Sequence, residues 1–245
     1  MIVLAIESAT IEVGVALAGP GGLLAALVAR PGRRHVETLH PAIVAVCSAA
    51  STPLASVGAV CVDVGPGLFT GIRVGVAAAK GVAFGLGVPV VTCTSIEVLA
   101  EAAQDVALTV VPVVDMRRGE VAWAVPGQDM RIGSTEDLAA DLAGLAREAM
   151  LVGDGALRHR VAILEATVAL GGAAPRIASE DLGAPGVAAL ARLGIRRLAA
   201  GATTDAARAE PCYLRPPDAR ANWVSRPAPV VDVGARVDPT AVPWR

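Results

Sequence analysis

Apolar residues near the start of the chain fall into three short runs separated by turn residues. The runs cover residues 2–6, 13–18 and 23–28, and "GPGG" joins the second to the third. Runs of this length, bounded by glycine and proline, are typical of β-strands connected by tight turns. The pattern therefore predicts an antiparallel meander of three strands.

After the meander the apolar spacing becomes helical. Residues 36–50 carry Val36, Leu39, Ile43 and Val46 on one stripe of a predicted helix. The pattern then predicts a strand, a helix, a strand and a helix, at residues 59–62, 70–86, 88–91 and 94–103. The first hundred residues therefore have the element order βββαβαβα.

The same order recurs with weaker signals in the second half of the chain. Residues 106–114 and 120–125 predict a hairpin over "DMRRG", and further strands and helices follow. Capping residues begin helices in both halves, with Thr94 and Glu97 forming a capping box in the first and Ser134 in the second. Two such units in tandem predict an α/β fold, the duplicated ribonuclease-H-like (βββαβα) architecture of the actin-like superfamily.

This duplication predicts the domain organisation. We expect an N-terminal lobe at residues 1–104, a C-terminal lobe at residues 105–215, and a Pro-rich tail with little structure of its own at residues 216–245. A chain of 245 residues is long enough for two lobes that share an interface.

Composition narrows the functional classes. Hydrophobic residues make up 54% of the chain and charged residues 18%, so a packed core is expected. The formal net charge of -2 argues against a protein that grips nucleic acid on its own, because phosphate contacts dominate such binding. The apolar stretch at residues 74–91 is interrupted by Lys80, four glycines and Pro89, so it is a poor membrane span.

The cysteines and the N-terminus predict a cytoplasmic protein. The four cysteines lie far apart without a CxxC motif, which suggests neither a zinc cage nor a disulfide framework. The opening "MIVLAIESAT" lacks the charged region and the cleavage site of a signal peptide.

The stretch "VDVGPGLFTGIRVGVAAAKG" raises the question of phosphate binding, because glycines crowd a turn between a strand and a helix. A P-loop requires GxxxxGK[ST], but Ile72 and Arg73 follow Gly71 here. A dinucleotide loop requires GxGxxG, whereas Gly65, Gly67 and Gly71 are spaced one residue too widely. Both specific phosphate motifs are therefore absent.

The helix after the loop has small residues along one face. At 100° per residue, this face carries Gly71, Gly75, Ala78, Val82 and Gly85. Since a glycine inside a helix costs about 1 kcal/mol relative to alanine, the stripe predicts that another backbone comes very close. That backbone belongs either to the chain's own sheet or to a second protein.

Several segments in order resemble the TsaB family, over about residues 1 to 215. These segments are "LAIESAT", "GPGLFTGIRVGVAAAKGVAFGLGVPV", "TSIEVLA", "VDMRRGEVAWA", "LVGDGA" and "PCYLR". The long glycine-loop block and the hairpin segment are the specific signals. The resemblance implies an actin-like fold and a non-catalytic subunit of the bacterial machinery that makes threonylcarbamoyladenosine in tRNA.

The same resemblance implies particular partners and a particular surface. Members of the family pair with the catalytic paralogue TsaD, and the ATPase TsaE joins the assembly. We therefore expect a heterodimer with a TsaD homologue, a homodimer when the chain is alone, and contact with tRNA only through the complex. The expected interface comes from the two helices after the meander, at residues Val36, Leu39, Ile43, Gly71, Gly75, Ala78, Val82 and Gly85.

Candidate catalytic and metal-binding residues are few. The catalytic relatives carry a pair of metal-binding histidines after the strand that follows the glycine-loop helix, and "VVTCTSIEV" has none there. His35 and His40 are about 140° apart on a helix, so we expect surface residues near a helix start, and His159 stands alone. We predict no metal, no cofactor and no catalytic residue.

The first turn and the strand ends also argue against catalysis. The family's usual Asp-Thr-Ala-Thr is replaced here by Glu7-Ser8-Ala9-Thr10, which weakens the approach to a metal-bound nucleotide. The aspartates that end predicted strands have a turn-capping interpretation, and they are Asp63, Asp115 and Asp154. The competing hypothesis is an independent enzyme, either an actin-like ATPase or sugar kinase or a glycoprotease-type hydrolase. A direct nucleic-acid binder is the second alternative.

Overall fold

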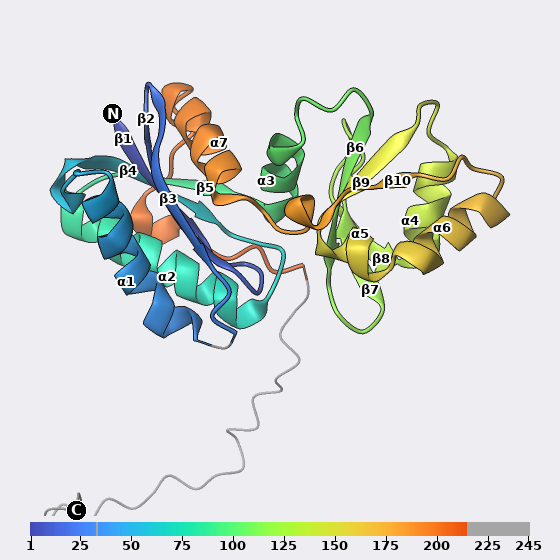
Figure 1. Ribbon diagram of the computed structural model, residues 1–245, viewed down its shortest axis with the longest axis horizontal. Helices are drawn as coiled ribbons and strands as arrows, with labels where there is room; N and C mark the ends of the chain where they lie inside the picture. The colour runs from blue at the N-terminus through green and yellow to red at the C-terminus, as the bar shows by residue number, and fades with distance from the viewer. Residues whose placement is uncertain (33, 215–245) are drawn as a thin grey trace, which may run out of the picture. The chain divides into compact units, whose positions relative to one another are not determined.

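The structure, a computed structural model, describes residues 1–32 and 34–214 and is shown in Figure 1. Its first sheet has five strands in the order β3-β2-β1-β4-β5. They are β1 (Ile2–Glu7), β2 (Val13–Gly19), β3 (Gly22–Ala29), β4 (Val57–Asp63) and β5 (Val90–Cys93). The first three strands are antiparallel, as the predicted meander requires, and β4 and β5 extend the sheet in parallel.

The second sheet repeats this arrangement. Its strands are β6 (Thr109–Asp115), β7 (Glu120–Trp123), β8 (Arg131–Ser134), β9 (Ala149–Val152) and β10 (Arg176–Ile177). Read from β8, their order is third, second, first, fourth and fifth strand of the unit, as in the first sheet. The predicted α/β fold, with its duplicated ribonuclease-H-like units, is therefore confirmed.

Seven α-helices and three short 3₁₀ turns connect the strands in the part of the chain that the structure describes. They are α1 (His35–Ala49), α2 (Phe69–Leu86), α3 (Ser95–Ala102), α4 (Thr135–Ala143), α5 (Asp154–Arg158), α6 (Arg160–Ala169), α7 (Val187–Ala199), η1 (Leu54–Ser56), η2 (Glu180–Leu182) and η3 (Ala206–Arg208). Both predicted capping residues are confirmed, since Thr94 and Ser134 each accept a bond from the backbone N–H three residues on.

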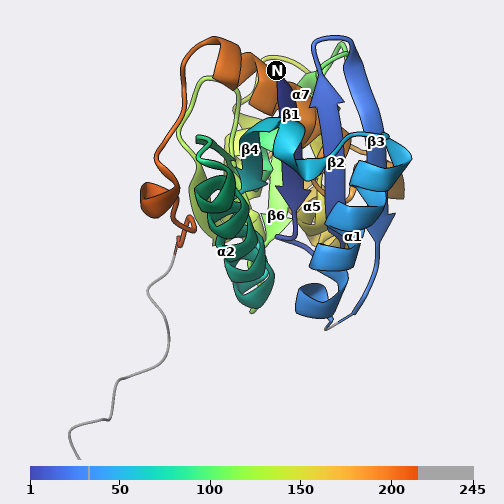
Figure 2. The same ribbon diagram turned by 90° about the vertical axis from the view of Figure 1, so that its left-hand side faces the viewer.

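The first sheet is covered on both faces. Helices α1 and α2 lie on one face, where Leu39, Ile43 and Ile72 join a core of buried strand residues (Figure 2). Helix α7 covers the other face, where Val187 and Leu190 pack against the strands. Strands β1, β2 and β4 are therefore buried on both faces, whereas Leu23, Leu24 and Val28 of the outer strand β3 are exposed.

The predicted boundary between the lobes is wrong for the end of the chain. The sequence pattern places residues 105–215 in the second lobe, but α7 packs on the first sheet, where Gly194 lets the helix approach Cys61. Residues 203–214, here called the return segment, also lie on this lobe, where Thr204 bridges Val90. Apolar residues of α7 and of the return segment therefore complete the core of the first sheet, whose strands lie more than ninety residues earlier in the sequence. The predicted tail at residues 216–245 lies outside the described residues.

Helix α2 is long and apolar enough, by length and composition, to cross a membrane. In this structure one face of the helix packs in the core, because Ile72, Val76 and Ala79 are buried against the sheet. Its two cationic side chains also bind the return segment, through Arg73 to Tyr213 and through Lys80 to backbone carbonyls. These contacts account for the buried face of α2, whereas other apolar side chains of the helix, such as Phe84, remain exposed.

Candidate functional site

The glycine loop packs against the first turn of the chain. Strand β4 ends at Asp63, and the loop leads into α2, where the Leu68 N–H donates to the Ala9 carbonyl at 2.6 Å. A Cβ at Gly67 would lie 2.2 Å from that same carbonyl oxygen. The loop glycine thus makes room for the turn after β1, and a backbone carbonyl faces the start of α2.

Gly71 and Gly75, the next two glycines, also make room for the turn after β1. A Cβ at Gly71 would lie 2.0 Å from the Ser8 carbonyl oxygen, and one at Gly75 would lie 2.3 Å from the Ser8 hydroxyl oxygen. Ser8 is fully buried, and its hydroxyl donates to the Gly71 carbonyl at 2.8 Å. The assignment of Gly71 and Gly75 to a partner interface is therefore wrong, because the close backbone is the chain's own.

The glycine stripe changes character toward the end of α2. Gly85, the last residue of the predicted stripe, is exposed, as is Gly81 beside the stripe, and a Cβ built at either residue would meet nothing within 4 Å. Close packing against this chain therefore explains Gly71 and Gly75, whereas Ala78 and Val82 are half-buried and Gly85 is open to solvent.

An apolar groove of about 440 Å³ runs between α1 and α2. This α1–α2 groove is lined by Val36, Leu39, His40, Ile43, Val74, Ala77, Ala78, Gly81 and Val82. Val36 is 67% exposed, whereas Leu39 and Ile43 are buried in the core below. Of the eight predicted interface residues, the groove brings together Val36, Leu39, Ile43, Ala78 and Val82.

Sequence reasoning missed four residues of the groove and a second cavity beside it. The groove lining also includes His40, Val74, Ala77 and Gly81. These residues lie three or four positions from the predicted ones on the same two helices, so helical spacing in the sequence could have identified them. Gly85 is not among the groove residues, so it stands apart from the site expected for it.

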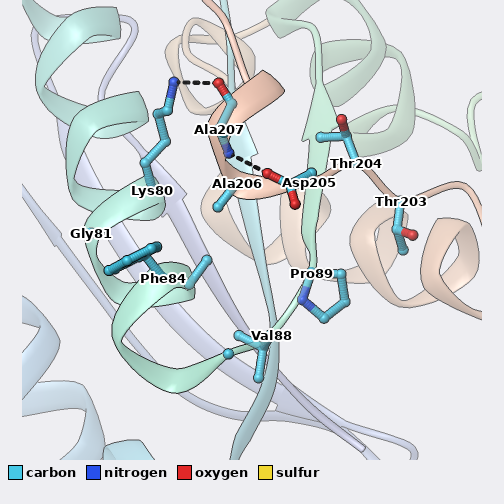
Figure 3. Close-up of a pocket in the computed structure, with 12 residues that line it drawn as sticks. Lys80, Gly81, Phe84, Val88, Pro89, Thr203, Thr204, Asp205, Ala206 and Ala207 are labelled. Atoms are coloured by element: carbon cyan, nitrogen blue, oxygen red, sulfur yellow. Dashed lines mark hydrogen bonds between the residues drawn. The ribbon is translucent and has the colours of Figure 1, made fainter.

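The second cavity, of about 920 Å³, lies on the other flank of α2 against the return segment (Figure 3). Phe84, which is 87% exposed, stands at this cavity, and Gly81 lines both the cavity and the α1–α2 groove. The Lys80 ammonium fixes the opposite wall by donating to the carbonyls of Ala207 and Ala209 at 3.0 and 3.1 Å. More than a hundred residues separate these walls in sequence, so no local pattern could predict the cavity.

Two acidic side chains are buried at the ends of the first and fourth strands. Asp63 accepts from the Gly65 N–H at 2.8 Å and from the Ser95 hydroxyl at 2.8 and 2.9 Å, which confirms the predicted turn-capping role. Burial raises the pKa of Asp63 to about 7. Glu7 accepts from the Ala9 N–H, and burial, followed by the nearby Asp63, raises the pKa of Glu7 well above its usual range.

A cleft of about 450 Å³ lies between the two sheets, lined by residues of both units such as Glu12 and Arg117. Asp115 is held in it by His159 at 3.1 Å, Arg117 at 3.1 Å and Arg158 at 3.5 Å. The basic side chains of this cleft are therefore paired with acidic side chains of the same chain.

The remaining acidic and histidine side chains form contacts within the chain. Asp154 accepts from the Asp115 N–H at 2.9 Å, so its role at the strand end is structural, as predicted. His159, which stands alone in the sequence, contacts Asp115. His35 is buried with its Nε2 2.9 Å from the Thr10 carbonyl, so the expectation of a surface residue is wrong for His35 and right for the exposed His40. Among the described residues, no three His, Cys, Asp or Glu side chains are grouped to hold a metal ion.

Comparison with known proteins identifies the family. The family model for TsaD, tRNA N6-adenosine threonylcarbamoyltransferase, matches residues 20–155, which is more than half of the chain. The tRNA threonylcarbamoyladenosine biosynthesis protein TsaB of Escherichia coli is 33% identical over 126 residues, covering 51% of this chain and 54% of that protein. The chain belongs to the TsaB family. An uncharacterized protein of Mycobacterium tuberculosis is 36% identical over 143 residues, covering 57% of this chain and 66% of its own length.

Solved structures support the same family assignment. A structure of YeaZ from Pseudomonas aeruginosa is 26% identical, with a TM-score of 0.71, and the match covers 87% of this chain and 99% of that chain. A second structure from that organism, described as similar to peptidase YeaZ, has a TM-score of 0.75 at 25% identity. The sequence matches span 54% and 66% of the two curated relatives described above, whereas the match to the YeaZ structure spans 99% of that chain.

Proposed function

We propose that this chain is a non-catalytic pairing subunit of a tRNA threonylcarbamoyladenosine machinery, and that it docks on a TsaD homologue through the α1–α2 groove. The observation that carries the proposal is the groove itself, an apolar surface on the helices that the family resemblance assigns to pairing. In the proposed complex the TsaD homologue transfers the threonylcarbamoyl group to N6 of the adenosine next to the anticodon. The ATPase TsaE joins this assembly, and the tRNA is reached through the complex.

The electrostatics of the cleft favour this role over that of an independent ATPase, kinase or hydrolase. The side chain of Asp115 is 2% exposed and already neutralised by neighbouring cations, so it is poorly placed to hold a metal-bound phosphate. Glu7 and Asp63 have raised pKa values, and metal ligands must be deprotonated. We further propose that the protein acts in the cytoplasm, where tRNA is modified.

Binding to the purified TsaD homologue tests the proposal. Val36→Glu places a charge on the rim of the groove, and Val161→Glu on α6 is the matched control, since the two valines are 67% and 61% exposed. We expect Val36→Glu to weaken binding in calorimetry by at least about tenfold, because a carboxylate is desolvated against an apolar surface, and Val161→Glu to leave it unchanged. Equal affinity of the two variants contradicts the docking proposal.

A reconstituted modification assay tests the catalytic assignment. Threonylcarbamoyladenosine formation by the TsaD homologue and TsaE should require this chain and should fall with Val36→Glu. The isolated chain should hydrolyse no ATP. Turnover of ATP by the chain alone supports the competing enzyme hypothesis instead.

A further inference from the structure

The hairpin between β6 and β7 has a strained tip. Arg117 and Arg118 both adopt the left-handed backbone region, with φ of 64° and 57°, and Gly119 follows with φ of 83°. Turns prefer glycine, asparagine or aspartate at such positions, because other side chains are strained there. Backbone strain of this kind gathers at binding sites, so the tip indicates a role for its two arginine side chains.

A buried carboxylate fixes this tip. Asp115 accepts from the Arg117 N–H at 3.1 Å and also faces the guanidinium groups of Arg117 and Arg158. The side chain of Asp115 is 2% exposed, whereas those of Arg117 and Arg158 are 47% and 59% exposed. The negative charge is therefore turned into the protein, and the positive charges face solvent at the mouth of the cleft between the sheets.

Pairing with Asp115 leaves most of the arginine donors free. A guanidinium carries five N–H groups, and only one terminal nitrogen of Arg117 and one of Arg158 face the carboxylate. Arg160, two residues after Arg158 at the start of α6, is exposed, and its side chain has no partner among residues 1–32 and 34–214. Three exposed guanidinium groups with free donors thus belong to the hairpin tip and to the adjoining helices α5 and α6.

We propose that Arg117, Arg158 and Arg160, here called the arginine patch, bind backbone phosphates of the tRNA when the chain is in its complex. Guanidinium groups bind phosphate through charge-assisted hydrogen bonds, often two at a time. Phosphates repeat along a nucleic acid, so arginines on separate elements can each contact one of them without reading the sequence.

This inference rests on the proposed function and deepens it, since the complex there reaches the tRNA as a whole. The isolated chain has a net charge of -2, and three phosphate contacts alone give weak binding at physiological salt. The arginine patch therefore adds to contacts that the TsaD homologue makes, and it uses none of the residues of the α1–α2 groove.

Filter binding of tRNA to the complex of this chain with the TsaD homologue tests the proposal. Each lost phosphate contact lowers the slope of log affinity against log salt concentration by about 1. Arg158→Gln combined with Arg160→Gln should therefore flatten the slope by about 2 and weaken binding at low salt by at least about tenfold. Arg158→Lys combined with Arg160→Lys keeps both charges and should keep most of the slope.

Arg176→Gln combined with Arg208→Gln is the matched control, because it removes the same charge elsewhere on the chain. Arg176 is 64% exposed and paired with Glu148, much as Arg158 is paired with an acidic side chain. Arg208, like Arg160, is exposed and has no side-chain partner in the described part of the chain. This control should leave both the slope and the affinity for tRNA unchanged.

Two results overturn the proposal while the proposed function stands. One is an unchanged slope in the glutamine variant when its complex is intact. The other is a glutamine variant that loses affinity for the TsaD homologue in calorimetry, because the arginine patch is then a protein contact. A wild-type chain that does not bind the TsaD homologue removes the proposed function and this inference together. Should the double variant not fold, Arg160→Gln alone, whose side chain makes no bond within the described residues, should flatten the slope by about 1, and an unchanged slope again overturns the proposal.

Discussion

Replacement of Gly71 by alanine tests the claim that the glycines of α2 serve the chain's own fold. The added Cβ would lie 2.0 Å from the carbonyl oxygen of Ser8, and a Cβ rarely comes closer to another atom than 3.0 Å. The turn after β1 must therefore move by about 1 Å. Ser8 is fully buried and bonded to Gly71, so it has no free space to move into.

The magnitude follows from three effects. Overpacking of a close-packed region costs about 1–3 kcal/mol, and loss of the Ser8–Gly71 hydrogen bond costs about 1 kcal/mol more. The better helix propensity of alanine recovers about 1 kcal/mol. We therefore expect Gly71→Ala to lower the free energy of unfolding by about 2 kcal/mol.

Gly81→Ala is the matched control on the same helix. A Cβ at Gly81 meets nothing within 4 Å, so this variant should gain up to about 1 kcal/mol from propensity alone. Urea unfolding followed by circular dichroism should place the two variants on opposite sides of the wild type, about 1 M apart in midpoint. The reasoning is refuted by a Gly71→Ala protein that is as stable as the wild type but no longer binds the TsaD homologue, because that result returns Gly71 to the partner interface.

Three further predictions concern pH, the return segment and ligands. The pKa of Asp63 is raised on folding from 3.8 to about 7, so its contribution to stability is complete below about pH 4 and is lost as the pH rises through 7. In the Asp63→Asn variant up to about 4 kcal/mol of this pH-dependent change in the free energy of unfolding should be absent. Urea midpoints that fall equally in the wild type and the variant between pH 5 and pH 8 contradict this prediction. Lys80→Met keeps the aliphatic stem but removes two hydrogen bonds to the return segment. Thermal melting should show a loss of about 1–2 kcal/mol in the free energy of unfolding. An unchanged melting temperature means that these hydrogen bonds do not stabilise the fold. Elemental analysis of the lone chain should find no stoichiometric metal. The lone chain should also bind tRNA far more weakly than nanomolar at physiological salt, and a nanomolar dissociation constant in a filter-binding assay contradicts this prediction.

The fold could be predicted from the sequence because its signals are local. Apolar runs of strand length, helical stripes and two capping residues lie within short segments, and they specify the order of elements in both units. The prediction for α7 was wrong because the apolar stripe of a helix does not show which of two sheets the helix packs against. Its buried residues Val187 and Leu190 would suit the face of either sheet.

The site could be predicted only in part, for a similar reason. The apolar stripe on α1 showed which residues face inward or sideways, and the groove contains five of the eight expected residues. The stripe on α2 could not show which backbone approaches Gly71 and Gly75, because a glycine indicates close approach without naming the neighbour. The cavity at Phe84 depends on a contact between α2 and the return segment, which is long-range in sequence.

The packing of the first turn explains why the loop resembles a phosphate site without matching one. In a phosphate-binding loop the backbone N–H groups at the start of the helix point at an anion. Here the Leu68 N–H donates to the Ala9 carbonyl, and the Ser8 hydroxyl donates to the first turn of α2. The turn after β1 therefore occupies the position from which a phosphate would approach, and the glycines make that occupation sterically possible. The same residues that weaken a nucleotide site also fix α2 against the sheet, which holds the helix rigidly in place as one wall of the α1–α2 groove.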